Sequence, residues 1–352
     1  MRRLALLSSL VLALGCGARP PAATDDGGSP TEDSQAPQPD AGTEDATPLD
    51  HCNATDPRAS AVVVSAQPED GETTYSDFIS HAMTSIRVFG FEMGYGATLD
   101  GLVAKAKAGV DVRVILDGVA EVNVNTKYKT QLEAAGAKVE WSDAQFTYMH
   151  AKTMVRDDVE ALVSTGNYSR TYILKERNYT ARLTDVSDVA DVKSLFEADW
   201  NRTAPELSCT RLLVSPINSR DRLVALIASA TKSIDIESMQ YDDSAVKKAV
   251  LERKSAGVAV RVLLADPSWI SANATAGSYL VSDGIPARWL GSPDVHVKAI
   301  VVDGARAYLG SENISYTSLT KNREIGIIHE DAAALAVMQT TFEADWAAAT
   351  SF

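Results

Sequence analysis

The amino-acid sequence predicts an α/β protein made of two similar halves, each a mixed β-sheet flanked by helices. The first observation is an internal repeat, in which AGVDVRVILDG at 108–118 returns as AGVAVRVLLAD at 256–266. The second is the nearly continuous apolar run inside both copies, Val110–Leu116 and Val258–Leu264, which is typical of strands covered by helices on both faces. The third is the alternation of short apolar segments with longer mixed ones, which indicates alternating strands and helices.

In the first half the expected elements follow one another from residue 62 to residue 200. Short apolar runs predict strands at Val62–Ser65, Ile86–Met93, Val110–Leu116, Lys138–Trp141, Val159–Ser164 and Tyr179–Leu183, together with a strand that carries a histidine motif. The longer segments between them predict helices at Tyr75–Thr84, Thr98–Ala108, Lys127–Ala135 and Ser187–Trp200. The second half is expected to repeat this order.

The pentapeptide FEADW closes both halves, at Phe196–Trp200 and Phe342–Trp346. Its aromatic residues lie at helical spacing, so we expect them to pack into the core. Corresponding residues are 148 positions apart early in the repeat and 146 apart from the histidine motif onward. The repeats are therefore predicted to occupy 58–207 and 208–352, lengths that allow each a core of its own.

Residues 1–16, MRRLALLSSLVLALGC, place two arginines before an apolar run. This is the pattern of an export signal, and the run is too short for a spanning helix. Its end resembles a bacterial lipoprotein signal, in which Cys16 would become the lipidated first residue, although Ala13 stands where leucine is usual. We therefore expect an exported protein with a lipid anchor in the cell envelope; a plain secretory signal is the alternative.

Residues 17–57 are rich in small, acidic and proline residues, so they are predicted to form a disordered acidic linker. Of the 47 acidic and 33 basic residues in the chain, nine and three lie in 1–57, which leaves 38 and 30 in 58–352, a balance of −8. This balance disfavours a nucleic-acid partner, which usually meets a basic surface. No metal-ligand spacing of His, Cys and acidic residues is found, and neither a metal nor another cofactor is expected.

The chain has three cysteines. If Cys16 is lipidated or removed, Cys52 and Cys209 remain, each shortly before the first strand of a half. In an exported protein such a pair favours a disulfide, and two free thiols are the alternative.

Two histidine motifs, MHAKTMVRDD and VHVKAIVVDG, stand at equivalent places in the halves. Side chains two residues apart on a strand share a face, so His150 lies beside Lys152, and His296 beside Lys298. An imidazole next to an ammonium group suits an anionic substrate. The aspartates of the motifs lie an odd number of residues from the histidines, so we expect them to fix a turn or strand end; they are Asp157 and Asp303.

A two-residue hairpin turn is expected at the Asp-Gly pair that ends the second motif. Its register would set His296 opposite Ser311, and the same count in the first half sets His150 opposite Thr165. An asparagine follows two residues later in each half and therefore lies on the same strand face; these are Asn167 and Asn313. Lysine, histidine, a hydroxyl group and asparagine would thus converge at one strand end in both halves.

These residues resemble the phospholipase D superfamily, whose mark is His-x-Lys-x4-Asp followed by Gly-Ser-x-Asn. The second half fits fully, with His296, Lys298, Asp303, Gly310, Ser311 and Asn313. The first half has His150, Lys152 and Asp157, then Ser164-Thr165-Gly166-Asn167, so threonine replaces serine and the glycine is displaced. Eleven residues after Asn313 stands Glu324, where the family places a carboxylate that orients a catalytic histidine; the first-half counterpart is Asn178.

The resemblance implies the phospholipase D fold, with one active site at the seam between the repeats. One imidazole attacks phosphorus to form a covalent phosphohistidine, and the other protonates the leaving alcohol and then activates water. By the same resemblance His150 is the nucleophile, Glu324 reaches it across the seam, and His296 is the acid. The lysines and asparagines of the motifs are expected to stabilise the charge on phosphorus, with Thr165, Ser311, Asn178 and the two aspartates in supporting roles.

Cleavage of phospholipid head groups is the expected activity. The export signal, the acidic body and the apolar-aromatic lead-in Phe146–Met149 favour a lipid substrate and a membrane partner. An extracellular or periplasmic nuclease is the alternative, followed by a phosphatidyl transferase and a non-catalytic binding module. Because one chain supplies both halves, a monomer is sufficient.

Overall fold

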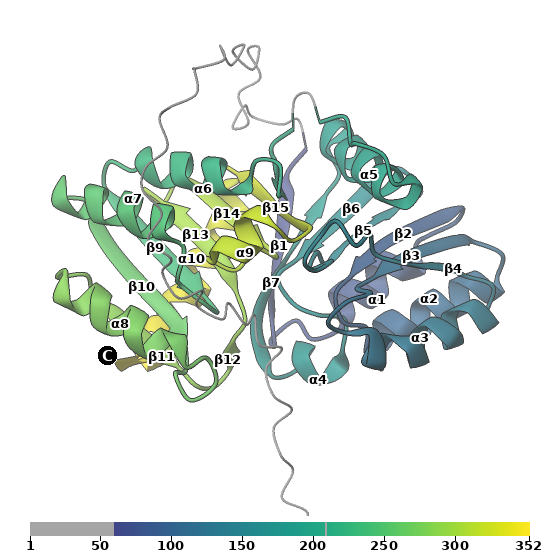
Figure 1. Cartoon of the computed structure of the whole chain (residues 1–352), viewed down its shortest axis with the longest axis horizontal. Helices are drawn as coiled ribbons and strands as arrows, with labels where there is room; N and C mark the ends of the chain where they lie inside the picture. Colours follow the sequence, from purple (N-terminus) through teal and green to yellow (C-terminus); the bar gives the residue numbers. More distant parts are fainter. Residues whose placement is uncertain (1–59, 208–209) are drawn as a thin grey trace, which may run out of the picture.

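The computed structural model describes residues 60–207 and 210–352, which fold into two lobes, one for each repeat (Figure 1). The predicted export signal, the linker and all three cysteines (Cys16, Cys52 and Cys209) lie outside the described residues. None of the helices in the described ranges combines the length and the apolar character that crossing a bilayer requires.

The first lobe alternates strands and helices as expected. Its strands are β1 (Val62–Gln67), β2 (Ser85–Gly90), β3 (Asp111–Leu116), β4 (Lys138–Trp141), β5 (Thr153–Arg156), β6 (Glu160–Ser164) and β7 (Glu176–Leu183). Its helices are α1 (Thr73–Ser80), α2 (Ala97–Lys107), α3 (Val122–Ala134), α4 (Arg170–Ile173) and α5 (Val186–Asn201). The one-turn helix α4 had no counterpart in the prediction, because four residues are too few for a helical period to show.

The second lobe repeats this order. Its strands are β8 (Leu212–Ser215), β9 (Ser233–Ser238), β10 (Ala259–Ala265), β11 (Ala287–Leu290), β12 (Asp294–Val295), β13 (Lys298–Val302), β14 (Arg306–Gly310), β15 (Glu324–His329) and β16 (Thr350–Ser351). Its helices are α6 (Ser219–Ala228), α7 (Ser244–Ser255), α8 (Ala272–Ser282), α9 (Tyr316–Thr320) and α10 (Ala332–Ala348). The prediction of two mixed sheets flanked by helices is confirmed.

The two sheets have the same strand order. The first runs β1-β7-β6-β5-β2-β3-β4 and the second β8-β15-β14-β13-β9-β10-β11, with β16 added at its far edge. Strand β12 of the second repeat leaves its own sheet and pairs in parallel with β7 of the first. The repeats are thus joined by backbone hydrogen bonds, and these bonds lie beside the second histidine motif.

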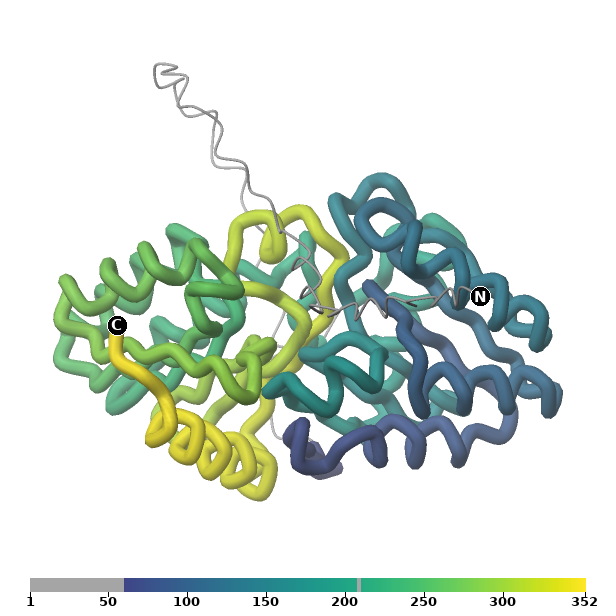
Figure 2. The backbone as a smooth tube through the Cα atoms, turned by 90° about the horizontal axis from the view of Figure 1, so that it is seen from below, coloured from purple at the N-terminus to yellow at the C-terminus, as the bar shows by residue number. Residues whose placement is uncertain are grey.

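The inner faces of both sheets share one apolar core. It takes side chains from β1, β7, β8 and β15 and from the long helices α5 and α10, so it continues across the seam. Two further cores lie under the outer helices, one beneath α1, α2 and α3 and one beneath α6, α7 and α8. Figure 2 shows the C-terminal helix α10 (yellow) beside the N-terminal end of the described chain (purple), where it packs against β1. The lobes therefore bury a common interior and hold the seam in a fixed geometry.

The expected hairpin register is wrong by one residue in both halves. Val302 pairs with Arg306 instead of Ala305, and Arg156 pairs with Glu160, so each turn has three residues. Asp303 at the start of the second turn has φ 56°. Its carboxylate is held by the neighbouring loop, which draws this residue out of the ladder. The histidines consequently do not stand opposite the hydroxyl residues of their own hairpin.

Candidate active site

The backbone of each motif histidine is held by the other repeat. The amide of His150 donates to the carbonyl of Arg323 at 2.9 Å, and the amide of His296 donates to the carbonyl of Arg177 at 3.1 Å. Both histidines lie on segments that have left their own sheet, before β5 and β13 begin. This exchange brings the two motifs to the seam, and a strand pattern within one repeat carries no signal for it.

The imidazole rings are also oriented across the seam. Nδ1 of His150 lies 2.8 Å from Oε2 of Glu324, and Nδ1 of His296 lies 3.0 Å from Oδ1 of Asn178. Because each acceptor engages Nδ1, both rings are left with Nε2 for chemistry. One imidazole is thus backed by a carboxylate and the other by a carboxamide.

The hydroxyl groups of the motifs hold these two acceptors. Thr165 Oγ1 donates to Asn178 Oδ1 at 2.9 Å, and the Ser311 hydroxyl hydrogen-bonds the carboxylate of Glu324. Gly166 gives the carboxamide its space, since a Cβ there would lie 2.6 Å from the side-chain carbon of Asn178. Further donors to Glu324 come from Ser318 and Asn322.

Both lysines are completely buried beside the histidines. The Nζ atoms of Lys152 and Lys298 donate at 2.6 Å to the carbonyls of His150 and His296, and Lys298 also reaches the carbonyl of Thr165 at 3.3 Å. Two cations in a dry site attract an anion strongly, because little water screens them. They are therefore placed to hold a phosphate group between the imidazoles.

The environment favours neutral imidazoles before an anion enters. Burial is the main cause that lowers the pKa of His150; the Glu324 carboxylate opposes it, and both lysines add to it. Burial also brings the pKa of His296 well below its ordinary value, with further contributions from Lys298, Lys152 and His150. A neutral His150 that donates Nδ1–H to Glu324 presents a lone pair on Nε2, which is the form that a nucleophile requires.

Glu324 remains ionised in spite of its burial. Burial alone would raise its pKa, but contact with His150, the Lys152 charge and the Ser311 hydroxyl together bring the pKa below the ordinary value. A charged carboxylate behind Nδ1 makes the opposite nitrogen of His150 more basic and fixes its tautomer.

The asparagines of the motifs lie just past the ends of β6 and β14. Asn167 and Asn313 are buried, and within the described chain neither Oδ1 atom has a hydrogen-bond partner. Buried amide oxygens are normally paired, so these two acceptors are available to a hydrogen-bond donor that enters the site. In the same described ranges, no group of three His, Cys, Asp or Glu side chains could hold a metal ion.

The two walls of the site differ in chemistry. On the first-repeat side, Phe91 stands edge-on to His150 at 4.5 Å, and burial raises the pKa of Glu92 to about 7. On the second-repeat side, Trp269 stacks on His296 at 6.2 Å.

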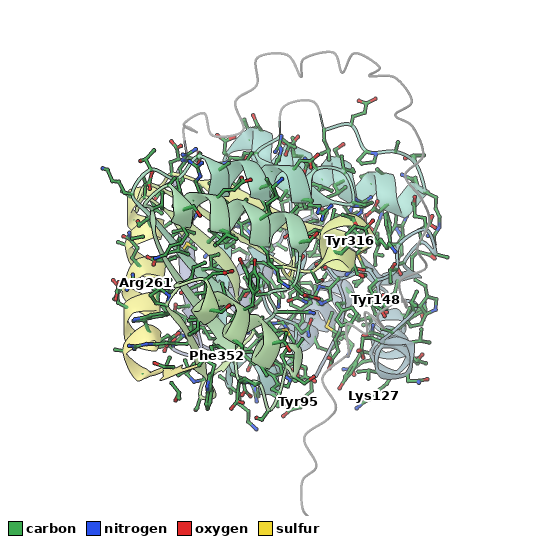
Figure 3. The ribbon with its side chains drawn as sticks, turned by 60° about the vertical axis from the view of Figure 1, so that its left-hand side comes forward. Tyr95, Lys127, Tyr148, Arg261, Tyr316 and Phe352 are labelled. Atoms are coloured by element: carbon green, nitrogen blue, oxygen red, sulfur yellow. The ribbon has the colours of Figure 1, made fainter. Side chains whose placement is uncertain are left out.

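The segment just before the first motif lies beside the second repeat: Figure 3 shows Tyr148 near the helix α9, which carries Tyr316. A backbone bond from the amide of residue 323 to the carbonyl of Tyr148, 2.9 Å long, joins these segments.

The motif aspartates lie outside the site and fix loops. The carboxylate of Asp157 accepts from the amides of residues 83–85 and from the hydroxyl of Thr84, at 2.7 to 2.9 Å. Asp303 does the same for residues 231–233. These bonds lower the pKa of each carboxyl from 3.8 to about 2, against the opposing effect of burial.

Replacing Asp157 with asparagine is expected to lower the free energy of unfolding by about 2 kcal/mol at pH 7, because charge-assisted bonds are lost. The folded-state pKa is depressed, so this stabilisation is present above pH 4 and disappears as the pH falls toward 2. Denaturant unfolding across that range measures the difference. Asp158→Asn, at a half-exposed neighbour, should change little, and a fall in kcat larger than the lost folded fraction would place Asp157 in the chemistry instead.

Sequence reasoning missed the buried ion pairs that join the two repeats, and two of them involve arginines next to the site. Arg323 binds Asp199 through two bonds of 2.8 Å, and Arg177 binds Asp345 at 2.6 and 3.0 Å. These arginines are the residues whose carbonyls hold the histidines. The aspartates are the fourth residues of the two FEADW segments, whose phenylalanines and tryptophans pack in the core as predicted. The sequence did contain a signal for these ion pairs: both FEADW segments keep an aspartate between two aromatic residues that pack in the core.

A family described as cardiolipin synthase, PLD-like domain, matches residues 75–200 and again residues 223–346. The two matches cover most of the chain and fall on the two lobes. The chain belongs to this phospholipase D-like family.

The chain is also similar to curated proteins that are named cardiolipin synthases or phospholipases D. The probable cardiolipin synthase YwiE of Bacillus subtilis is 22% identical over 324 residues, covering 79% of this chain and 65% of the relative. Phospholipase D Z of Dictyostelium discoideum is 30% identical over 159 residues, 39% of this chain and 37% of the relative. The chain thus spans less than two thirds of the length of both. Phosphatidylserine synthase from Haemophilus influenzae has the same fold, with a TM-score of 0.62 at 13% identity over 83% of this chain and 87% of that one.

Proposed function

We propose that this protein cleaves phospholipid head groups by a phospholipase D mechanism, through a covalent phosphohistidine on His150. The observation that supports it most is the pair of imidazoles, one from each repeat, held across the seam with a buried lysine beside each histidine. His150 is the nucleophile because its ring is backed by the ionised Glu324.

The reaction proceeds in two displacements. Nε2 of His150 forms a bond to phosphorus while the bond to the leaving oxygen breaks, and that oxygen keeps the electron pair and takes a proton from Nε2 of His296. Entry of the anionic phosphate raises the pKa of His296, which supplies the protonated ring for this step. Water then gives a proton to His296 and attacks phosphorus, and the bond to His150 breaks. The lysines stabilise the extra charge in both steps.

A lipid substrate is favoured over nucleic acid by the charge around the site. Two carboxyl groups, those of Glu92 and Glu121, lie within electrostatic reach of Lys152. Acidic groups repel a polyanion that must run through the site, but they tolerate a single phosphodiester with a cationic or hydroxylated head group.

Transfer of the phosphatidyl group to an alcohol is the second candidate. The relatives named cardiolipin synthases favour it. It uses the same first step, with a glycerol hydroxyl in place of water in the second.

Purified protein given phosphatidylglycerol, phosphatidylcholine, cardiolipin or DNA distinguishes these activities. Phosphatidic acid with free glycerol is the expected product of hydrolysis, and cardiolipin with free glycerol is the product of transfer. Cleavage of DNA and of none of the lipids would refute the proposal. It would also be refuted if no substrate gave a product, or if His150→Ala formed the same products as the original protein.

A further inference from the structure

The two repeats carry a carboxylate and a carboxamide in opposite order around their seam arginines. The first repeat reads ERN at 176–178, and the second reads NRE at 322–324. In both triplets the third residue contacts the histidine of the other repeat. The replacement of the expected acid by Asn178 is therefore accompanied by an acid two positions earlier, where the second repeat has Asn322.

The contact between acid and amide is kept in both triplets. Asn178 Nδ2 donates to Glu176 Oε2 at 3.2 Å, and Asn322 Nδ2 donates to Glu324 Oε1 at 3.1 Å. Oε2 of Glu176 also lies 3.7 Å from Nδ1 of His296. The side chain of Glu176 is 8% exposed, so little water separates this carboxylate from the ring.

We propose that Glu176 is a positioning residue that supplies, from behind Asn178, the negative charge that His296 needs as the general acid. This inference rests on the proposed function. While the bond between phosphorus and the leaving oxygen breaks, the proton on Nε2 of His296 moves to that oxygen. A carboxylate near Nδ1 holds the ring in its protonated form until that transfer, and it fixes the amide that accepts from Nδ1–H.

His296 requires such a charge because its other neighbours are cationic. The ammonium group of Lys298 lies 3.1 and 3.3 Å from its two ring nitrogens. Lys152 and His150 also lower its pKa. Asn178 is a neutral acceptor and cannot offset these charges.

The state of Glu176 suits a partner that shares a proton with the ring. Burial raises its pKa to about 7; the Asn178 bond and Lys298 oppose this rise, while Asp294 and Glu92 add to it. A carboxyl group that titrates near neutral pH is ionised when the neighbouring imidazole is protonated, and it takes up a proton when the ring is neutral.

The dependence on the leaving group tests this role. In Glu176→Gln the kcat for phosphatidylglycerol, whose leaving group is an alcohol, should fall about 10- to 100-fold. This loss is a part of the rate enhancement that general acid catalysis provides. The kcat for bis-p-nitrophenyl phosphate should change by less than about 3-fold, because p-nitrophenolate leaves without a proton. KM should stay unchanged for both, since Glu176 lies behind Asn178.

Exchange of the two residues provides a rescue. The double variant Glu176→Asn with Asn178→Glu gives the first repeat the order of the second, so a carboxylate takes the place of the Asn178 amide in contact with His296. Its kcat for phosphatidylglycerol should return to within about 5-fold of the original protein, whereas Glu176→Asn alone should stay low.

A buried carboxylate away from the site serves as the matched control. Glu160 on β6 binds Arg156 and Arg182, and Glu160→Gln should lower stability while affecting both substrates alike. Equal losses of kcat for the two substrates in Glu176→Gln, or a folded exchange variant without rescue, would overturn the inference. A parent protein inert toward both substrates would instead refute the proposed function.

Discussion

Removal of the His150 side chain is expected to abolish turnover, with kcat for phosphatidylglycerol falling on the order of 10,000-fold or more. The reason is that His150, oriented by Glu324, supplies the lone pair that attacks phosphorus in the proposed mechanism. The lysines would still bind the substrate, so KM should change little. Turnover of phosphatidylglycerol, followed by release of glycerol, measures both constants.

The matching variant His296→Ala separates nucleophile from acid. After rapid acid quenching, mass spectrometry of His296→Ala with bis-p-nitrophenyl phosphate should find the nitrophenyl phosphate adduct on His150, because this leaving group needs no proton. His150→Ala should give no adduct with any substrate. An adduct on His296 in the His150→Ala protein would reverse the two roles.

The seam ion pair between Asp199 and Arg323 is expected to have the second largest effect. Asp199→Asn leaves a guanidinium group buried without its counter-charge, which should lower the free energy of unfolding by about 3–5 kcal/mol. The carbonyl of Arg323 holds His150, and the next residue, Glu324, orients its ring. A displacement of about 1 Å at this point should also lower kcat about 100-fold. Denaturant unfolding and steady-state kinetics give the two numbers.

Two controls separate stability from catalysis. The double variant Asp199→Leu with Arg323→Met removes both charges and should recover most of the stability lost in Asp199→Asn, as is common for buried ion pairs. Asp188→Asn breaks another buried bridge, to Arg211, and should lower stability without lowering kcat of the folded protein. Full activity in folded Asp199→Asn would show that the ion pair does not position His150.

Much of the fold could be predicted because local pattern and duplication agreed. The apolar run Val110–Leu116 predicted β3 almost to the residue, and β4 was predicted with its observed ends. The short helices α4 and α9 are too brief to show a period. The hairpin register failed because Asp157 and Asp303 bind distant loops, which lengthens each turn by one residue.

The sequence predicted most of the residues of the candidate site, but it predicted few of the contacts that hold them. The repeated spacing of histidine, lysine and asparagine identified the chemical groups, and the tertiary structure brings the two histidines, the two lysines and Glu324 to one seam. The seam arginines and the FEADW aspartates went unrecognised, since each partner lies more than 100 residues away along the chain.

The sequence by itself determined that there are two homologous α/β units and which groups each contributes to phosphate chemistry, because apolar periodicity and motif spacing are local properties of the chain. The family resemblance already led us to expect that Glu324 reaches His150 across the seam. Only the tertiary structure decided that the backbone of each repeat holds the histidine of the other, and that Glu176 stands behind the amide that faces His296. That arrangement depends on backbone pairing and buried charges across the seam, and such long-range contacts leave no period in the sequence.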